Sequence, residues 1–171
     1  PIWIAGDSEA THRLAARRGY TPIITGRGSG PDYLGEMRAR IDSSYVAEGF
    51  SAAGHPLGIL RFACVTESVS ETEAYLENVR YQLRLAGALR NRGEAMSQGM
   101  MVEAAIPGEL SLEELAKNLP VGDAETVAER LHADIKAAGA SHVMLNIQAG
   151  ASTMAQARRT IDSFSSDIRP A

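Results

Sequence analysis

The sequence has 171 residues, of which 44% are hydrophobic and 22% charged, a balance typical of a soluble globular protein with one domain. The net charge is -4 and no basic run is present, so a nucleic-acid partner has little support. No apolar stretch reaches the roughly 18–20 residues of a membrane span. No signal peptide is recognisable, and the single cysteine forms no internal disulfide. We therefore expect a cytoplasmic protein without membrane or nucleic-acid partners.

The chain opens at Pro1 without a methionine and runs directly into an apolar, strand-like segment. N-termini are more often polar and frayed. We therefore expect that further sequence precedes residue 1 or is carried on a separate chain.

Strands and helices alternate in the first part of the chain. A strand at 1–6 is followed by a helix at 8–18 that stops at Gly19. A second strand at 21–25 leads through a glycine-rich loop into a helix that starts at Pro31. The apolar positions expected to face inward are Ala10, Leu14 and Ala15 in the first helix and Leu34, Met37, Ile41 and Tyr45 in the second.

A third strand and a long helix follow. The strand is expected at about 59–66, and Ser70 with Glu73 has the pattern of a capping box ahead of a helix that runs to about Leu89. Residues 91–121 interrupt the alternation, so we interpret them as an insertion loop, with a short helix at 111–118 and a possible role as a lid. The apolar face of the long helix is formed by Leu76, Val79, Leu83 and Ala86.

The alternation then resumes. Asp123 is expected to cap a helix that Gly139 closes, and a strand at 142–148 leads into the last helix. The apolar residues of these two helices are Val127, Leu131 and Ile135, then Met154, Ala157, Ile161 and Phe164.

Four alternations of strand and helix predict an α/β fold with a parallel sheet and crossover helices. Four strands form either a small three-layer open sheet or half of an eight-stranded barrel. Hydrophobic periodicity does not choose between the two.

The segment Gly6-Asp7-Ser8-Glu9-Ala10-Thr11 joins the first strand to the first helix. A helix N-terminus presents free N–H groups and the positive end of the helix dipole, so it suits a phosphate. Ser8 and Thr11 are three residues apart, which places both hydroxyls on one side of the first turn. The alternative is that Asp7 or Ser8 only caps the helix.

Glycines at positions 26, 28 and 30 resemble part of a dinucleotide-binding loop, but Pro31 stands where that pattern needs a glycine. A flexible strand-to-helix loop is the better interpretation, and such a loop can still line the mouth of a pocket.

The other reactive side chains give little support for a catalytic or metal site. His12, His55, His132 and His142 have no metal-ligand spacing, so no metal is predicted. His12 is expected to be exposed or to line the first turn, and Cys64 to be a small buried hydrophobe. The methionines Met96, Met100 and Met101 either face a hydrophobic substrate or fill the insertion loop.

Two segments carry a family resemblance. Pro1–Tyr20, PIWIAGDSEATHRLAARRGY, resembles the fifth strand and helix of the bacterial luciferase-like flavin-dependent monooxygenases. Leu119–Ala171, with LPVGDAETVAERLHADIKAAGASHVMLNI, is similar to the end of the same barrel. The resemblance implies that residues 1–171 are the C-terminal half, strands 5–8, of a (β/α)8 TIM barrel. It also implies that the insertion at 91–121 corresponds to the mobile loop over the active site.

The resemblance implies a cofactor and its contacts. In the family, the start of the helix after strand five holds the phosphate of FMN, which places Gly6, Asp7, Ser8 and Thr11 at the phosphate. The backbone amides of Asp7 and Ser8 and the hydroxyls of Ser8 and Thr11 are then the expected contacts. Family members that use a deazaflavin usually lack this pattern, so FMN is favoured. No catalytic residue is carried over, because the catalytic histidine of luciferase lies in the other half.

The implied function is an FMN-dependent monooxygenase that uses reduced flavin and molecular oxygen to oxidise a small apolar organic substrate. Its expected partners are a flavin reductase and either the missing N-terminal barrel half or a second copy of the chain, as a homo-oligomer. The alternatives are a non-catalytic flavin-binding relative and a deazaflavin-dependent oxidoreductase of the same fold.

Overall fold

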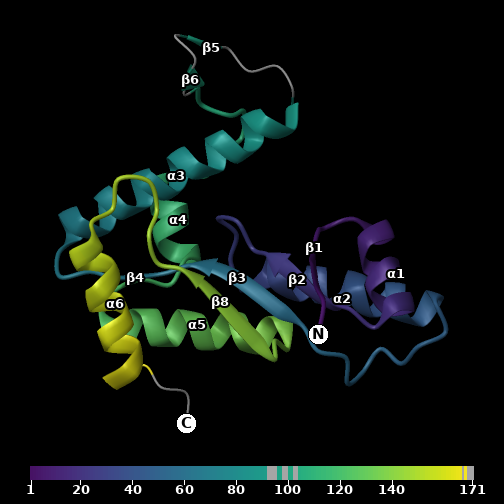
Figure 1. Ribbon diagram of the computed structural model, residues 1–171. Coiled ribbons are helices and arrows are strands. Elements are labelled where there is room, and N and C mark those ends of the chain that lie inside the picture. Colours follow the sequence, from purple (N-terminus) through teal and green to yellow (C-terminus); the bar gives the residue numbers. More distant parts are fainter. Residues whose placement is uncertain (92–95, 98–99, 102–103, 167, 169–171) are drawn as a thin grey trace.

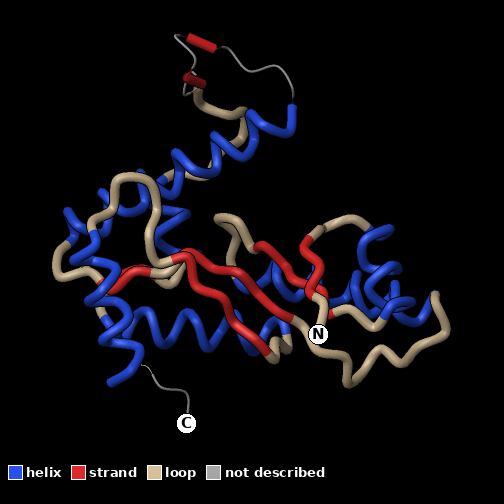
Figure 2. The backbone as a smooth tube through the Cα atoms, viewed as in Figure 1, coloured by secondary structure: helices blue, strands red, loops and turns tan. Residues whose placement is uncertain are grey.

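A computed structural model describes residues 1–91, 96–97, 100–101, 104–166 and 168 (Figures 1 and 2). In this part of the chain, strands and helices alternate as the sequence predicts. In chain order, the elements are β1 (Trp3–Ala5), α1 (Glu9–Arg18), β2 (Thr21–Thr25), α2 (Pro31–Ala47), β3 (Gly58–Phe62), β4 (Cys64–Val65), α3 (Val69–Asn91), β5 (Met96–Ser97), β6 (Met100–Met101), α4 (Leu112–Asn118), β7 (Val121–Gly122), α5 (Ala124–Ala138), β8 (His142–Asn146) and α6 (Met154–Ser166).

The main sheet has four parallel strands in the order β1-β2-β3-β8. Helices α1, α2 and α5 pack side by side, α2 between the other two. A single apolar cluster joins these helices to β2 and β3, so they form one layer on one face of the sheet. A three-layer open sheet needs helices on both faces. The arrangement is therefore half of a (β/α) barrel, with the helix layer as part of the outer ring.

The apolar core between the sheet and the helix layer confirms the periodicity of α2, since Leu34, Met37, Ile41 and Tyr45 are all buried. A second cluster lies at the other end of the molecule, where α3 and α4 pack together. It contains Cys64, which is fully buried as expected, and burial raises the pKa of its thiol. Figure 1 shows α3 extending from this region and carrying β5 and β6 at its far end.

The helix ends follow the predicted capping residues at Gly19, Gly139 and Asp123, and Ser111 adds a cap that was not predicted. Gly19 and Gly139 end α1 and α5 in the left-handed conformation, and their N–H groups donate to carbonyls of the last turn. Asp123 accepts the N–H of Thr126 at the start of α5. Ser111 forms a full capping box with Glu114 at the start of α4.

Two expectations about the middle of the chain are wrong. The strand expected at 59–66 is divided at Ala63: β3 stays in the main sheet, whereas β4 leaves it and pairs with β7. The predicted cap at Ser70 and Glu73 lies two residues too late. Ser68 Oγ accepts the N–H of Glu71, and the Glu71 carboxylate accepts the N–H of Glu67.

Helical periodicity also misplaces some apolar residues. Ala10 is exposed, and so are Met154 and Ile161 in α6, at 68% and 55%. The buried side of α6 is formed by Ala157 and Thr160, and the Thr160 hydroxyl accepts the N–H of Val65.

The short strand β7 was not predicted, because two residues carry no periodicity. The side chains of Met96, Met100 and Met101 lie outside the described set.

A buried arginine links four elements at the carboxyl end of the sheet. Arg61 is 0% exposed and its Nε donates to Asp134 Oδ2 of α5 at 2.7 Å. Its Nη2 donates to the carbonyls of Ser29 and Asn118 at 2.8 and 2.9 Å. These bonds join β3 to α5, to the loop after β2 and to the end of α4. Removing one partner of such a pair leaves a buried charge uncompensated, at a cost of about 3–5 kcal/mol.

The buried Arg61 leads to a prediction about Gly26. A Cβ at Gly26 would lie 2.1 Å from Arg61 Nη1 and 3.0 Å from Leu34 Cδ2, and the bonds of Arg61 prevent it from moving away. We expect Gly26→Ala to lower the free energy of unfolding by about 1–3 kcal/mol. The control is Gly35→Ala inside α2, where the nearest atom is 3.6 Å away and alanine favours the helix. Equal stability of the two variants in urea unfolding would contradict this.

Candidate functional site

The carboxyl ends of the parallel strands meet at one edge of the sheet, and the turn between β1 and α1, residues 6–11, lies there. Ser8 is the N-cap of α1, and its Oγ accepts the N–H of Thr11 at 3.2 Å. The hydroxyls of Ser8 and Thr11 are 2.9 Å apart and hydrogen-bonded to each other. Since the hydroxyl that accepts in this pair keeps its own proton, the turn presents a free O–H donor together with first-turn N–H groups.

Gly6 and His12 fix the shape of this turn. A Cβ at Gly6 would lie 2.9 Å from the Thr11 side chain, so glycine is needed for Thr11 to pack here. His12 lines the turn as expected but is only 2% exposed, and its Nε2 donates to the Gly6 carbonyl at 3.0 Å. Burial lowers the pKa of His12, while the Gly6 carbonyl opposes that shift in part.

Asp7 does not cap the helix. Its Oδ2 accepts a hydrogen bond from Arg27 Nη2 at 2.9 Å, and its Oδ1 is buried without a partner in the described part of the chain. Arg27 belongs to the glycine-rich loop after β2. Gly6, Asp7, Ser8 and Thr11 therefore lie in one turn, and Arg27 contacts this turn through Asp7.

A cavity of about 700 Å³ lies at the carboxyl ends of β2, β3 and β8. We call it the strand-end cavity. Leu60 and Phe62 of β3 face it, whereas Ile59 and Arg61 face the helix layer, as the alternation of a strand requires. The lining residues are Thr25, Arg27, Gly28, Ser29, Leu60, Phe62, Arg80, Gln82, Leu83, Ala86, Gly87, Ile106, Gly108, Glu109, Leu110 and Asn146.

The segment 106–110, which belongs to the predicted insertion, forms one wall of the strand-end cavity and is attached to α3 by an ion pair. Arg84 donates to both oxygens of Glu109, at 2.8 and 2.6 Å, and Glu109 also accepts the N–H of Ile106. These donors lower the pKa of Glu109 to about 2. The wall is therefore held at neutral pH by a bidentate pair.

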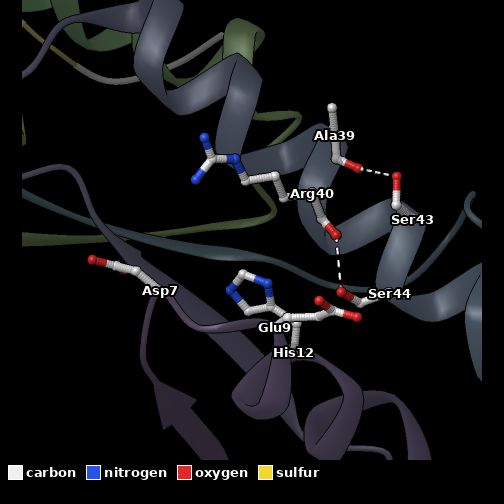
Figure 3. A pocket seen from close by; sticks show the side chains of 7 residues that line it. All are labelled: Asp7, Glu9, His12, Ala39, Arg40, Ser43 and Ser44. Carbon is white, nitrogen blue, oxygen red and sulfur yellow. Dashed lines mark hydrogen bonds between the residues drawn. The ribbon is translucent and has the colours of Figure 1, made fainter.

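A second cavity, of about 530 Å³, lies between α1 and α2 (Figure 3). Asp7, Glu9 and His12 line one side, and α2 supplies the other. Figure 3 shows that the hydroxyls of Ser43 and Ser44 turn back onto their own helix, where they donate to the carbonyls of Ala39 and Arg40. These two hydroxyls are therefore engaged within α2, and the charged side chains of Asp7, Glu9 and Arg40 remain as the polar lining of this groove.

The remaining histidines lie apart from the β1–α1 turn and from the strand-end cavity. His132 and His142 are exposed, and His55 bonds to Asp42 and stacks on Tyr45. Within the described residues, no group of three or more His, Cys, Asp or Glu side chains is placed to hold a metal ion. No helix among them is long and apolar enough to cross a membrane.

Sequence reasoning missed the strand-end cavity, although one signal was available. Leu60 and Phe62 alternate with Ile59 and Arg61, so one face of β3 is apolar and points away from the helices. Arg27 was missed because the loop was judged by its glycines alone.

Comparisons with known proteins identify the family and the fold. The family model of the luciferase-like monooxygenases matches residues 1–142. The uncharacterized protein y4vJ of Sinorhizobium fredii is 30% identical over 172 residues, which cover 100% of this chain and 49% of the relative. The chain belongs to the luciferase-like monooxygenase family, and it spans about half the length of this curated relative.

Solved structures show the same half of a longer fold. The oxygenating constituent of 3,6-diketocamphane monooxygenase from Pseudomonas putida, solved with FMN, is 20% identical with a TM-score of 0.64, over 99% of this chain and 48% of its own. The coenzyme F420-dependent tetrahydromethanopterin reductase of Methanopyrus kandleri is 13% identical with a TM-score of 0.65, over 98% and 50%. At these identities the likeness shows the fold.

The lowered pKa of His12 predicts a pH dependence of stability. The unfolded chain takes up a proton near pH 6.5, whereas folded His12 does so only at lower pH, so stability falls as the pH falls through 6.5. In His12→Gln this contribution is absent. We expect the stability difference between the two proteins to shrink from pH 7.5 to 5.5 in chemical unfolding. A constant difference across this range would contradict a neutral, buried His12.

Proposed function

We propose that this chain is the flavin-binding half of a luciferase-like barrel that oxidises a small apolar organic substrate with reduced FMN and molecular oxygen. The observation that carries the proposal is the β1–α1 turn, where two hydroxyls and the helix N-terminus converge. The turn is joined through Asp7 to Arg27, which lines the strand-end cavity. Membership of a family of monooxygenases supports the reaction class.

The residues of the turn fit a phosphate. Ser8 and Thr11 offer a hydroxyl donor, and the N–H groups of Glu9 and Ala10 have no intrahelical acceptor, because the carbonyls they would need precede the helix. The helix dipole adds a favourable potential for an anion. Ser8 also caps α1, so the capping interpretation is correct for Ser8 and is compatible with phosphate binding.

The strand-end cavity fits an apolar ring system and an apolar substrate. Leu60, Phe62 and Leu83 line it from the sheet and from α3, and Ile106 and Leu110 line it from the insertion. When bound, reduced FMN would provide the chemical step with molecular oxygen. The roles of this chain are to bind the phosphate, to orient the ring and to exclude water from it.

A complete barrel needs a partner for this half. In the described sheet, β1 and β8 form the two edges, and Trp3 and Ile2 are 37% and 58% exposed at the β1 edge. Unpaired parallel strands with an apolar inner face favour association. We propose that the missing N-terminal half, or a second copy of this chain, closes the barrel, and that a separate reductase supplies the reduced flavin.

Two other functions of the same fold are alternatives that experiment can distinguish. The second candidate is a deazaflavin-dependent oxidoreductase, because one of the similar structures is an F420-dependent reductase. A flavin-binding protein without catalysis is the third candidate. Binding of FMN without substrate oxidation in the complete barrel would identify the third, and preference for F420 the second.

The turn is tested by comparing FMN with riboflavin, which lacks the phosphate. In the complete barrel, replacing Ser8 and Thr11 together by alanine removes charge-assisted hydrogen bonds worth about 1.5–3 kcal/mol each. We expect FMN binding, measured by fluorescence quenching, to weaken about tenfold or more, with riboflavin binding unchanged. Equal weakening of both flavins would mean that the turn is only a helix cap.

The need for a partner is tested by sedimentation of this chain expressed alone. We expect a species larger than the 18.2 kDa monomer, because the inner face and both edges of the sheet favour association. Mass spectrometry under denaturing conditions identifies whether a second chain is present. A stable, soluble monomer would contradict the expectation.

A further inference from the structure

Arg27 has an uncommon backbone conformation. Its φ is 49°, and in the described part of the chain all other residues with a positive φ are glycines. It stands between Gly26 and Gly28, in a loop where a glycine would adopt this conformation without steric cost. Residues held in such conformations gather at binding and active sites, where one side chain must reach one point. What the conformation places here is a guanidinium group.

This guanidinium lies between the β1–α1 turn and the strand-end cavity. Nη2 donates to Asp7 Oδ2 at 2.9 Å, while Arg27 itself lines the cavity. Among the described residues, the guanidinium of Arg27, which has five N–H donors, bonds to the Asp7 carboxylate, and the Arg27 side chain is 46% exposed. Donors of Arg27 therefore remain for a ligand that extends from the turn into the cavity.

The negative charge of Asp7 explains why a cationic side chain is useful at position 27. The Asp7 carboxylate adjoins the N-cap Ser8, where the proposed phosphate would bind, and its Oδ1 is buried without a partner in the described set. A lone carboxylate at this position would repel a phosphate. Arg27 neutralises it, so the turn retains the positive potential of the helix N-terminus.

We propose that Arg27 is the cationic side chain of the phosphate subsite: it offsets Asp7, donates its remaining N–H groups to the phosphate of FMN, and confers selectivity for the phosphorylated flavin. A guanidinium suits this task because its planar fork of donors matches phosphate oxygens. The proposal rests on the proposed function and adds a residue of the second βα loop to it.

The test measures FMN and riboflavin binding to the complete barrel by fluorescence quenching. Arg27→Gly removes the guanidinium and suits the left-handed backbone, so thermal stability is expected to stay level or rise. FMN binding is expected to weaken about tenfold or more, while riboflavin binding stays unchanged. Arg17→Gln is the matched control: it removes an exposed arginine paired with Glu48 at the other end of α1, and both affinities should stay unchanged.

A second variant tests the role of Asp7. If Arg27 offsets the carboxylate, Asp7→Asn combined with Arg27→Gly recovers part of the FMN affinity that Arg27→Gly loses. Absence of any recovery would overturn the neutralising role. The salt dependence of FMN binding should also become weaker in Arg27→Gly.

The possible failures are distinguishable. If Arg27→Gly keeps the FMN-to-riboflavin preference of the unmodified protein, and the Ser8 and Thr11 variant loses it, the inference on Arg27 is wrong and the proposed function stands. If the unmodified barrel has no preference for FMN over riboflavin, both are overturned.

Discussion

The one-sided cover of the parallel sheet is the constraint on which the rest of the structure depends. The four strands of the main sheet are parallel, so each delivers its carboxyl end to the same edge, while α1, α2 and α5 cover one face. The loop after β2 and the wall at 106–110 line the strand-end cavity at this edge, and Arg27 of that loop bonds to Asp7 of the β1–α1 turn. In barrels of this type, the loops at this edge carry the binding groups and the sheet carries the stability.

Arg61 shows how the fold keeps that edge in order. A fully buried guanidinium costs much desolvation, and burial lowers the pKa of Arg61 while Asp134 opposes that shift. Its bonds to Ser29 and Asn118 tie the loop that carries Arg27 to the end of the insertion helix. Asn118 returns a bond to the carbonyl of Gly28, so the loop is held from both sides. Arg61 and Asn118 therefore hold the loop after β2 in place at the rim of the strand-end cavity.

Much of this architecture was predictable from local signals. Residues at helical spacing gave the buried side of α2, and capping residues such as Asp123 and Gly139 gave the helix limits. The division at Ala63 was not predictable, because an apolar run does not reveal which sheet a strand joins. The turn at 6–11 was found because its chemistry lies in consecutive residues. Arg27 and Arg61 were not, since their partners are 20 and 73 residues away in sequence.

Trp3 lies at the other end of the sheet from the cavity. Its indole packs against Gly58, where a Cβ would be 2.9 Å from the ring, and meets the His142 ring edge-on at 4.7 Å. The sequence contains one tryptophan, and it is 37% exposed at the amino end of the sheet. Emission from this indole therefore changes when another chain or segment covers this end of the sheet, because contact removes water from the ring.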